Sequence, residues 1–251
     1  MGQRFIAARR RSMRPNSAFQ RSRLAAQKSQ NLYFNRVLGL GLASPATVAQ
    51  IEEILRFYAE QKVKQFATEL SPLAQPAEIA KWLAQRGFQQ TEDSAKLWRR
   101  DALIADVATD FRIRCIGEAE AAAWVGVLGT VFRQFRSRGE WYAARVSAPG
   151  WHDYLAYADT EPAAIAAMYI QGDAAHLTDA ATLAPFRRRG AQHALISRRI
   201  ADGLAASCHW FTSETAAPQP GNPLVSHRNL RRVGFEIAYV RAKYMFDTRK
   251  G

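Results

Sequence analysis

Apolar residues recur with the period of an α-helix in several stretches of the chain. The clearest are residues 48–58, 118–135 and 191–204, where apolar positions follow mostly at intervals of three or four residues. This spacing places the apolar side chains on one face of a helix, which can then pack against a core. The pattern therefore predicts an amphipathic helix in each of the three stretches.

Short apolar or alternating runs separate these helices. They are bounded by glycine or proline, which is typical of β-strands and the turns between them. Strands and helices therefore alternate along the chain, as in α/β and α+β proteins. Strands are expected at residues 33–41, 63–70, 96–99, 111–116, 154–159, 163–171, 176–183 and 208–213.

The most informative stretch is residues 178–196. A strand that ends before Pro185 leads into Arg187–Arg189, and Gly190 then opens a helix. The first backbone N–H groups of a helix have no partner within the helix, and the helix dipole adds positive potential at the same end. With three guanidinium groups beside it, this helix start has the form of a phosphate-binding site.

This turn resembles the acyl-CoA-binding motif of the GNAT N-acetyltransferases, Arg/Gln-x-x-Gly-x-Gly/Ala, which lies between a strand and a helix. Arg187 matches the first position and Gly190 the central one, whereas Gln192 stands where the family usually has a small residue. The strand expected at residues 208–213 and the segment 226–235, which ends in Gly-Phe, are similar to the next parts of a GNAT domain. The resemblance covers the C-terminal half of the chain.

The arginine turn also has a simpler interpretation. A glycine preceded by arginines can be the ordinary, solvated start of a helix. For the turn taken alone, both interpretations stay open. The two flanking strands and the later Gly234-Phe235 pair favour the CoA site.

The resemblance implies a fold, a co-substrate and a set of binding residues. The fold is α/β (α+β): a mixed, mostly antiparallel central sheet flanked by helices, preceded by a smaller GNAT-like half-domain. Acetyl-CoA is the implied co-substrate, and no metal is expected. Main-chain groups before the turn would hold the pantetheine and the carbonyl, the turn would hold the pyrophosphate, and later polar side chains would bond to the pantetheine. The residues in these roles are Ala181, Thr182, Leu183, Arg187, Arg188, Arg189, Gly190, Ala191, Gln192, Ser226 and Asn229.

Direct acyl transfer from a thioester needs a deprotonated amine, a polarised carbonyl and a leaving thiolate, but no covalent nucleophile. Asp179 and Glu214, on or after expected strands, are the candidate bases, and each has the alternative interpretation of a strand-end carboxylate in solvent. Many GNAT enzymes place a tyrosine acid four residues before the Gly-Phe pair, where this chain has Leu230. Tyr239 or Tyr244 would replace it, or the thiolate leaves unassisted.

Residues 31–109 repeat the order found later in the chain: strand, glycine, helix, strand, helix and Gly-Phe. The glycines that bound the two patterns have similar spacing, 41–87 and 190–234. We therefore expect a degenerate GNAT-like half-domain here, followed by an acetyltransferase domain over residues 110–251. The first turn has no basic residues, so it should not hold a pyrophosphate. Chance similarity between two strand–helix segments is the alternative.

The bulk composition is that of a globular protein. With 251 residues, 48% of them hydrophobic and 23% charged, the chain can form one large domain or two ordinary ones. No apolar run has the length of a membrane span. Cys115 and Cys208 lack the spacing of a zinc site or disulfide framework, which fits a reducing compartment, and we expect a cytoplasmic protein. The sequence leaves the oligomeric state open.

The net charge of +13 is unevenly distributed, because residues 1–30 contain many arginines and no acidic residue. Such a segment buries little, and we expect a flexible basic tail. It could make weak contact with nucleic acid, contact anionic lipid, act as an organelle transit peptide, or be a solvated extension without a specific role.

The sequence is compatible with three functional hypotheses. The first is an acyl-CoA-dependent N-acetyltransferase that acts on an unidentified amine. The second is a GNAT-like module that binds CoA but has weakened catalysis, which Leu230 favours. The third is a nucleic-acid-associated protein that acts through its basic N-terminal arm.

Overall fold

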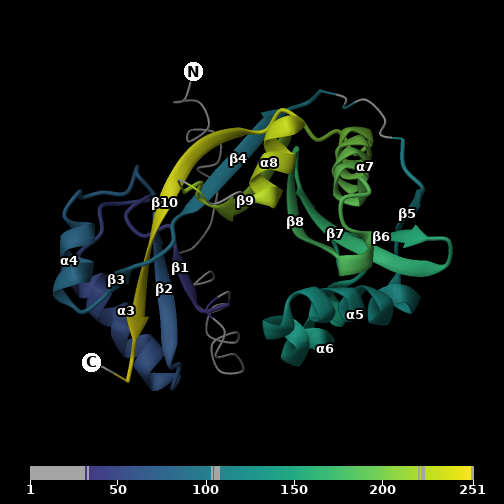
Figure 1. Cartoon of the computed structure of the whole chain (residues 1–251). Helices are drawn as coiled ribbons and strands as arrows, with labels where there is room; N and C mark the ends of the chain where they lie inside the picture. The colour runs from purple at the N-terminus through teal and green to yellow at the C-terminus, as the bar shows by residue number, and fades with distance from the viewer. Residues whose placement is uncertain are drawn as a thin grey trace. The chain divides into compact units, whose positions relative to one another are not determined.

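The computed structural model of the chain describes most of its residues, namely 32, 34–102, 104, 108–219, 221 and 224–249 (Figure 1). The chain divides into two compact units. Unit 1 is Met1–Thr91 together with Ala242–Gly251, and unit 2 is Glu92–Arg241. The basic segment predicted over residues 1–30 lies outside the described residues.

Unit 2 is built on a mixed sheet. Its strands are β4 (Ser94–Arg100), β5 (Phe111–Cys115), β6 (Trp151–Ala158), β7 (Glu161–Gln171), β8 (Ala174–Thr182), β9 (Trp210–Ala216) and the first half of β10 (Glu236–Asp247). They lie in the order β10-β4-β9-β8-β7-β6-β5. Neighbours are antiparallel except β8 and β9, which are parallel. The predicted mixed, mostly antiparallel sheet is confirmed.

Helices cover both faces of this sheet (Figure 1). One layer holds α5 (Ala121–Val131) and α6 (Gly139–Arg145), and the other holds α7 (Ala191–Ala205) and α8 (Val225–Arg232). Apolar side chains of the sheet and of the α7–α8 layer form one buried cluster, which stabilises their packing by removing apolar area from water. Its larger members include Leu97, Tyr154, Met168, Leu177, Leu195, Ile200, Phe211 and Phe235.

The helix predicted over residues 118–135 ends early, at Val131. A 3-10 turn, η2 (Arg133–Arg138), follows it. Within that turn Arg136 lies on Gly129: its Nε donates to the Gly129 carbonyl at 3.1 Å, and its Cγ is 3.2 Å from where a Cβ would stand. The single long helix is therefore wrong, because the absent side chain at Gly129 lets the chain fold back onto α5.

Unit 1 contains a strand–helix–strand segment with parallel strands. Strand β1 (Arg36–Leu38) pairs in parallel with β2 (Gln65–Leu70), and α3 (Val48–Glu60) connects them. Helix α4 (Ile79–Gln85) and the short strand β3 (Gln89–Gln90) follow. The end of β10 pairs with both β2 and β3 in antiparallel register.

Helix α3 begins at Val48, the first residue of the predicted amphipathic stretch 48–58. Its N-cap is Thr47, whose hydroxyl accepts from the Gln50 N–H at 3.2 Å, while the Gln50 side chain accepts from the Thr47 N–H at 2.9 Å. This reciprocal pair satisfies two backbone donors that the helix itself cannot. These two capping residues therefore set the start of the helix.

Both units contain the same strand–helix–parallel strand order, β1-α3-β2 and β8-α7-β9. The division into units differs in two places from the predicted segments 31–109 and 110–251. Strand β4 pairs within the sheet of unit 2, and residues 242–247 of β10 pair within unit 1. A segment boundary drawn along the chain misses this arrangement, because strand pairing connects residues far apart in sequence.

Gly203 in α7 and Gly126 in α5 offer a matched test of packing. A Cβ at Gly203 would lie 2.6 Å from Cε1 of buried Phe211, whereas at Gly126 it would meet no described atom within 4 Å. Gly203→Ala should lower the free energy of unfolding by about 1 kcal/mol, because overpacking outweighs the gain in helix propensity. Gly126→Ala should raise it by roughly 0.5–1 kcal/mol. Urea unfolding measures both, and a stabilised Gly203→Ala would contradict this packing.

Candidate functional site

The arginine turn joins β8 to α7. A 3-10 turn, η3 (Ala184–Phe186), follows β8 and contains the predicted strand-ending proline. Arg188 and Gly190 have positive φ, 63° and 84°, and Gly190 is the N-cap of α7. A positive φ is unstrained for glycine and uncommon for other residues. The turn from Arg187 to Gly190 is exposed throughout.

The start of α7 has the features of an anion-binding site. The Ala194 N–H donates to the Gly190 carbonyl at 3.1 Å, which closes the first turn. The N–H groups just before it, those of Ala191, Gln192 and His193, have no acceptor within the helix. The dipole of this 15-residue helix adds positive potential there. No described atom lies within 4 Å of where a Cβ would stand at Gly190, so a ligand can approach the backbone.

Two of the three arginines in the turn are anchored to the rest of unit 2. Arg187 donates through Nε to the Thr182 carbonyl at 3.2 Å. The Arg189 guanidinium lies over the rings of Phe111 and Phe186, at 5.0 and 5.7 Å from their centroids. The arginine between them is exposed. The turn thus presents three positive charges on a backbone that these contacts hold in place.

Gln192, which departs from the motif, is used inside the fold. Its amide nitrogen donates to the Ala181 carbonyl and the Thr182 hydroxyl, both at 3.0 Å, and to the Ile165 carbonyl at 3.4 Å. The side chain therefore turns back toward β7 and β8. A small residue could not make these bonds, which tie the helix start to the two strands.

Strand β8 contains a β-bulge at residues 179 and 180. The register pairs Ala167 with Thr178 and then Ile165 with Ala181, so two residues of β8 face one residue of β7. The first residue of the bulge has a φ of 47°. Such a bulge bends a strand and redirects its main chain.

Strands β8 and β9 separate just before this bulge. Their pairing runs from Ala174 with Trp210 to Leu177 with Ser213, although β8 continues to Thr182. Beyond that point β8 pairs with β7, and β9 pairs with β4. Each strand then has a main-chain edge that the other no longer pairs, which is where a pantetheine arm could bind.

The three residues predicted to offer main-chain groups come directly after the bulge. The Leu183 N–H donates to the Ala163 carbonyl at 2.9 Å, so this amide is used within the sheet. The carbonyls of Ala181 and Thr182 accept from side chains of the following turn and helix. Their role toward a ligand stays a prediction.

Asp179, a candidate base, forms an ion pair with Arg145, the last residue of α6. Arg145 also pairs with Asp153 of β6 at 2.6 Å, and its side chain is 5% exposed. Burial raises the pKa of Asp153, and the nearby guanidinium of Arg145 opposes that rise. Asp179 is therefore the partner of a buried cation rather than a strand-end carboxylate in solvent.

Glu214, the other candidate base, pairs with Lys96 and, at 3.1 Å, with Arg241. The strand register places Tyr239 of β10 opposite Lys96 of β4, and Lys96 opposite Glu214 of β9. Directly opposite residues of neighbouring strands point to the same face. The structure therefore aligns Glu214, Lys96 and Tyr239 in one row across three strands, although no sequence pattern indicated Lys96.

Arg199 on α7 is another residue that sequence reasoning missed. Its guanidinium donates to the carbonyls of Leu195 at 3.0 Å, Ala167 at 2.9 Å and Thr178 at 3.4 Å. The residue is 2% exposed, and burial lowers its pKa to about 10. One feature of the sequence could have indicated it: Arg199 lies on the same apolar face of the helix as Ile196 and Ile200, where a charged residue is unusual.

Ser226 and Asn229 lie on α8, exposed and half-buried respectively. The N-cap of this helix is Leu224, which makes no side-chain cap bond. Leu230, at the position of the usual tyrosine acid, is 6% exposed and belongs to the core cluster. That position cannot supply a proton in this chain, so Tyr239 and Tyr244 stay the tyrosine candidates.

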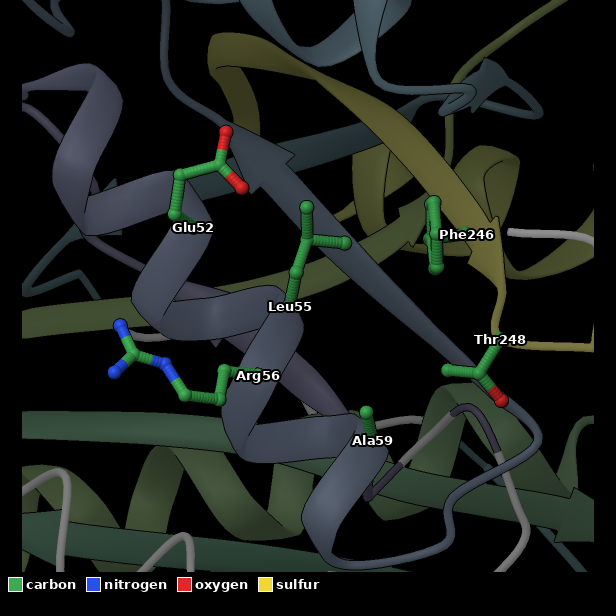
Figure 2. A pocket seen from close by; sticks show the side chains of 6 residues that line it. All are labelled: Glu52, Leu55, Arg56, Ala59, Phe246 and Thr248. Atoms are coloured by element: carbon green, nitrogen blue, oxygen red, sulfur yellow. The ribbon is translucent and has the colours of Figure 1, made fainter.

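Unit 1 has a shallow hollow of about 410 Å³ (Figure 2). It contains none of the predicted site residues. Two of its polar groups are bonded within the protein: Glu52 pairs with Arg86 at 2.6 Å, and the Thr248 hydroxyl donates to the Val63 carbonyl at 2.6 Å. Four lining residues belong to α3, one to β10, and one directly follows β10: Glu52, Leu55, Arg56, Ala59, Phe246 and Thr248.

In the part of the chain that the structure describes, no helix combines the length and the apolar character needed to cross a bilayer. No three His, Cys, Asp or Glu side chains gather as metal ligands would among those residues. Cys115 is exposed and Cys208 buried, and both are free thiols.

Comparison with solved structures identifies the fold. A GCN5-related N-acetyltransferase from Kribbella flavida matches with a TM-score of 0.64, over 87% of this chain and 83% of its own, at 15% identity. Another from Sphaerobacter thermophilus matches with a TM-score of 0.66, over 79% and 66%, at 12% identity. A tandem GNAT protein from the clavulanic acid biosynthesis pathway matches with 0.59, over 80% and 69%, at 15% identity.

No family model matches the sequence, and no curated protein matches it significantly. At identities this low, the structural likeness establishes the fold and leaves the substrate undetermined. The predicted GNAT-like fold is thus confirmed.

The bonds of Gln192 can be tested by stability. Gln192→Ala should lower the free energy of unfolding by about 1–3 kcal/mol, because carbonyls of β7 and β8 lose a donor. Gln192→Glu keeps the size of the side chain but presents acceptors to acceptors, so it should destabilise at least as much. His193→Ala, on the exposed face of the same turn, is the control and should change little. Urea unfolding that shows no difference between Gln192→Ala and the control would contradict these bonds.

Proposed function

We propose that the chain is an acyl-CoA-dependent N-acetyltransferase, which transfers an acetyl group directly from acetyl-CoA to an amine. The observation that carries the proposal is the open, arginine-flanked start of α7 next to the separation of β8 from β9, within a GNAT fold. An anion site and a free strand edge lie next to each other along the chain. A ligand in which a diphosphate is joined to a long extended arm can use both.

The residues present fit such a ligand. The pyrophosphate would accept from the N–H groups at the start of α7, while Arg187, Arg188 and Arg189 add positive charge. The pantetheine would follow the edge of β8 that β9 no longer pairs, and the acyl carbonyl would lie beside the bulge. Ser226 and Asn229 stay candidate contacts for the pantetheine.

The proposed reaction needs two proton transfers. The amine nitrogen attacks the thioester carbonyl, its proton passes through water to Glu214, and the carbon–sulfur bond breaks. Tyr239 gives a proton to the departing thiolate, so that CoA leaves as a thiol and the amide remains. Lys96 lies between these two residues in the sheet, because it is opposite Tyr239 on one neighbouring strand and opposite Glu214 on the other.

A second candidate function is a module that binds CoA without efficient catalysis. Its support is specific: both predicted carboxylate bases are in ion pairs, and a core leucine occupies the usual tyrosine position. The two functions share the cofactor site and differ only in turnover. They therefore need separate tests.

Binding is tested with two glycines of matched geometry. Gly190 and Gly39 have φ of 84° and 83°, and neither has a described atom within 4 Å of an added Cβ. Gly190→Trp should abolish the heat of acetyl-CoA binding and its increase in Tm, because a large side chain at the start of α7 blocks the amides. Gly39→Trp, which imposes the same backbone strain in unit 1, should leave binding unchanged. Calorimetry that shows no acetyl-CoA binding to the folded wild type would refute the proposal.

An assay of catalytic turnover distinguishes the acetyltransferase hypothesis from the hypothesis of a CoA-binding module. With a panel of amines and acetyl-CoA, release of free CoA thiol should be amine-dependent. Glu214→Gln should lower kcat/KM by roughly 10²–10⁴-fold, the usual contribution of a positioned base. Glu236→Gln, an exposed carboxylate on β10, is the control and should be silent. Binding of acetyl-CoA without turnover on any amine would favour the module.

A further inference from the structure

The bulge in β8 is held from both helical layers of unit 2. We propose that Arg145 and Arg199 are positioning residues that fix this bulge and thereby orient the acyl group of acetyl-CoA. The inference rests on the proposed function and deepens it, because neither arginine belongs to the motif that binds the cofactor. Both act through other groups: one through the Asp179 side chain, the other through main-chain carbonyls.

The bulge needs outside support for two reasons. Its first residue, Asp179, has a φ of 47°, a conformation that non-glycine residues seldom adopt. A bulge also interrupts the ladder of hydrogen bonds, so backbone groups around it need other partners. If the bulge were lost, the register of the following residues would slip by one. Ala181 and Thr182 would then turn to the opposite face.

Arg145 holds the bulge from the α6 side. It bonds the Asp179 carboxylate and is itself fixed by Asp153 at 2.6 Å. The rings of Trp124 and Trp151 lie against its guanidinium, at 4.9 and 4.1 Å. A cation with two carboxylate partners and aromatic neighbours has little freedom to move. The side chain of Asp179 is therefore held in one place, and the unusual backbone with it.

Trp124 extends this support to the residue opposite the bulge. In the register, residues 179 and 180 face Ala166 of β7. The Trp124 indole N–H donates to the Ala166 carbonyl at 3.3 Å. The ring that packs on Arg145 thus also supplies a donor to the interrupted ladder.

Arg199 holds the bulge from the α7 side. It donates to the carbonyls of Ala167, at 2.9 Å, and Thr178, at 3.4 Å, which belong to the last regular pair before the bulge. A third bond to the Leu195 carbonyl ties it to its own helix. The guanidinium therefore links α7, whose start is the proposed pyrophosphate site, to the two strands beside the proposed acyl site.

The consequence is specific to the acylated cofactor. The start of α7 would bind CoA and acetyl-CoA alike, because both carry the pyrophosphate. Only acetyl-CoA has a carbonyl to place beside the bulge. Loss of either arginine should therefore weaken acetyl-CoA binding more than CoA binding.

The test measures the ratio of the Kd for CoA to the Kd for acetyl-CoA by calorimetry. Wild type should prefer acetyl-CoA, and Arg145→Met, Arg199→Met and Asp179→Ala should each lower the ratio by about tenfold, the effect of losing roughly one well-placed hydrogen bond. Asp179→Asn should stay near wild type, because asparagine accepts from Arg145 and tolerates positive φ. The Arg145→Met/Asp179→Ala double variant should be no worse than either single one, since both remove one contact.

Two exposed arginines serve as matched controls. Arg114→Met removes an ion pair to Glu120 at 3.1 Å, and Arg198→Met removes one to Asp202 on α7 at 2.9 Å. Neither should change the ratio. The infrared carbonyl band of carbon-13-labelled acetyl-CoA gives a second readout. It should shift to higher frequency in Arg145→Met and Asp179→Ala, because the carbonyl loses polarisation, and stay in place in both controls.

The outcomes are distinguishable. If wild type binds neither ligand, the proposed function fails and takes this inference with it. If wild type binds both equally, or if folded Arg145→Met and Asp179→Ala keep the preference and the band, the inference fails while the cofactor site stands. If Asp179→Asn loses amine-dependent turnover and folded Asp179→Ala keeps the ratio and the band, Asp179 is a base and not a positioning residue. Should Arg199→Met not fold, the Asp179 and Arg145 variants decide the matter.

Discussion

Strand β8 has one neighbour along its full length and the other along only part of it. It pairs with β7 up to Thr182 but with β9 only as far as Leu177. Backbone groups that leave a ladder must find other partners, because burying them unpaired is costly. Side chains from the covering helices supply several of these partners. The site proposed for acetyl-CoA depends on this substitution, since it leaves one strand edge open while the strand itself stays in place.

Two buried guanidinium groups, those of Arg145 and Arg199, are stabilised by different kinds of partner. Arg145 is neutralised by two carboxylates and lies between aromatic rings. Arg199 is bonded to three main-chain carbonyls instead, and burial lowers its pKa to about 10. Both arrangements are costly to assemble and rigid once formed, because several donors of each guanidinium group have defined acceptors. Rigidity before the ligand arrives favours a site that must place a carbonyl accurately.

Local patterns predicted most elements around the arginine turn correctly. The strand before it, the helix after Gly190 and the strand near residue 210 lie close to their predicted positions. The predictions failed where distant segments decide. No strand was predicted at β10, which pairs with β4 in its first half and with β2 in its second. Helix α5 ends at Val131, before its apolar period does, and Arg136 packs back onto Gly129, a contact that the period does not reveal.

The sequence by itself determined the helix start at Gly190, its three arginines and the GNAT-like order of elements, because backbone preference and hydrophobic period act over a few neighbouring residues. Only the tertiary structure decided which charged side chains meet. Lys96 and Glu214 are 118 positions apart and pair only because β4 lies beside β9. The bulge at Asp179 and its arginines are equally nonlocal. Strand register and helix packing bring such residues together, and these follow from burial summed over the whole unit rather than from any single stretch.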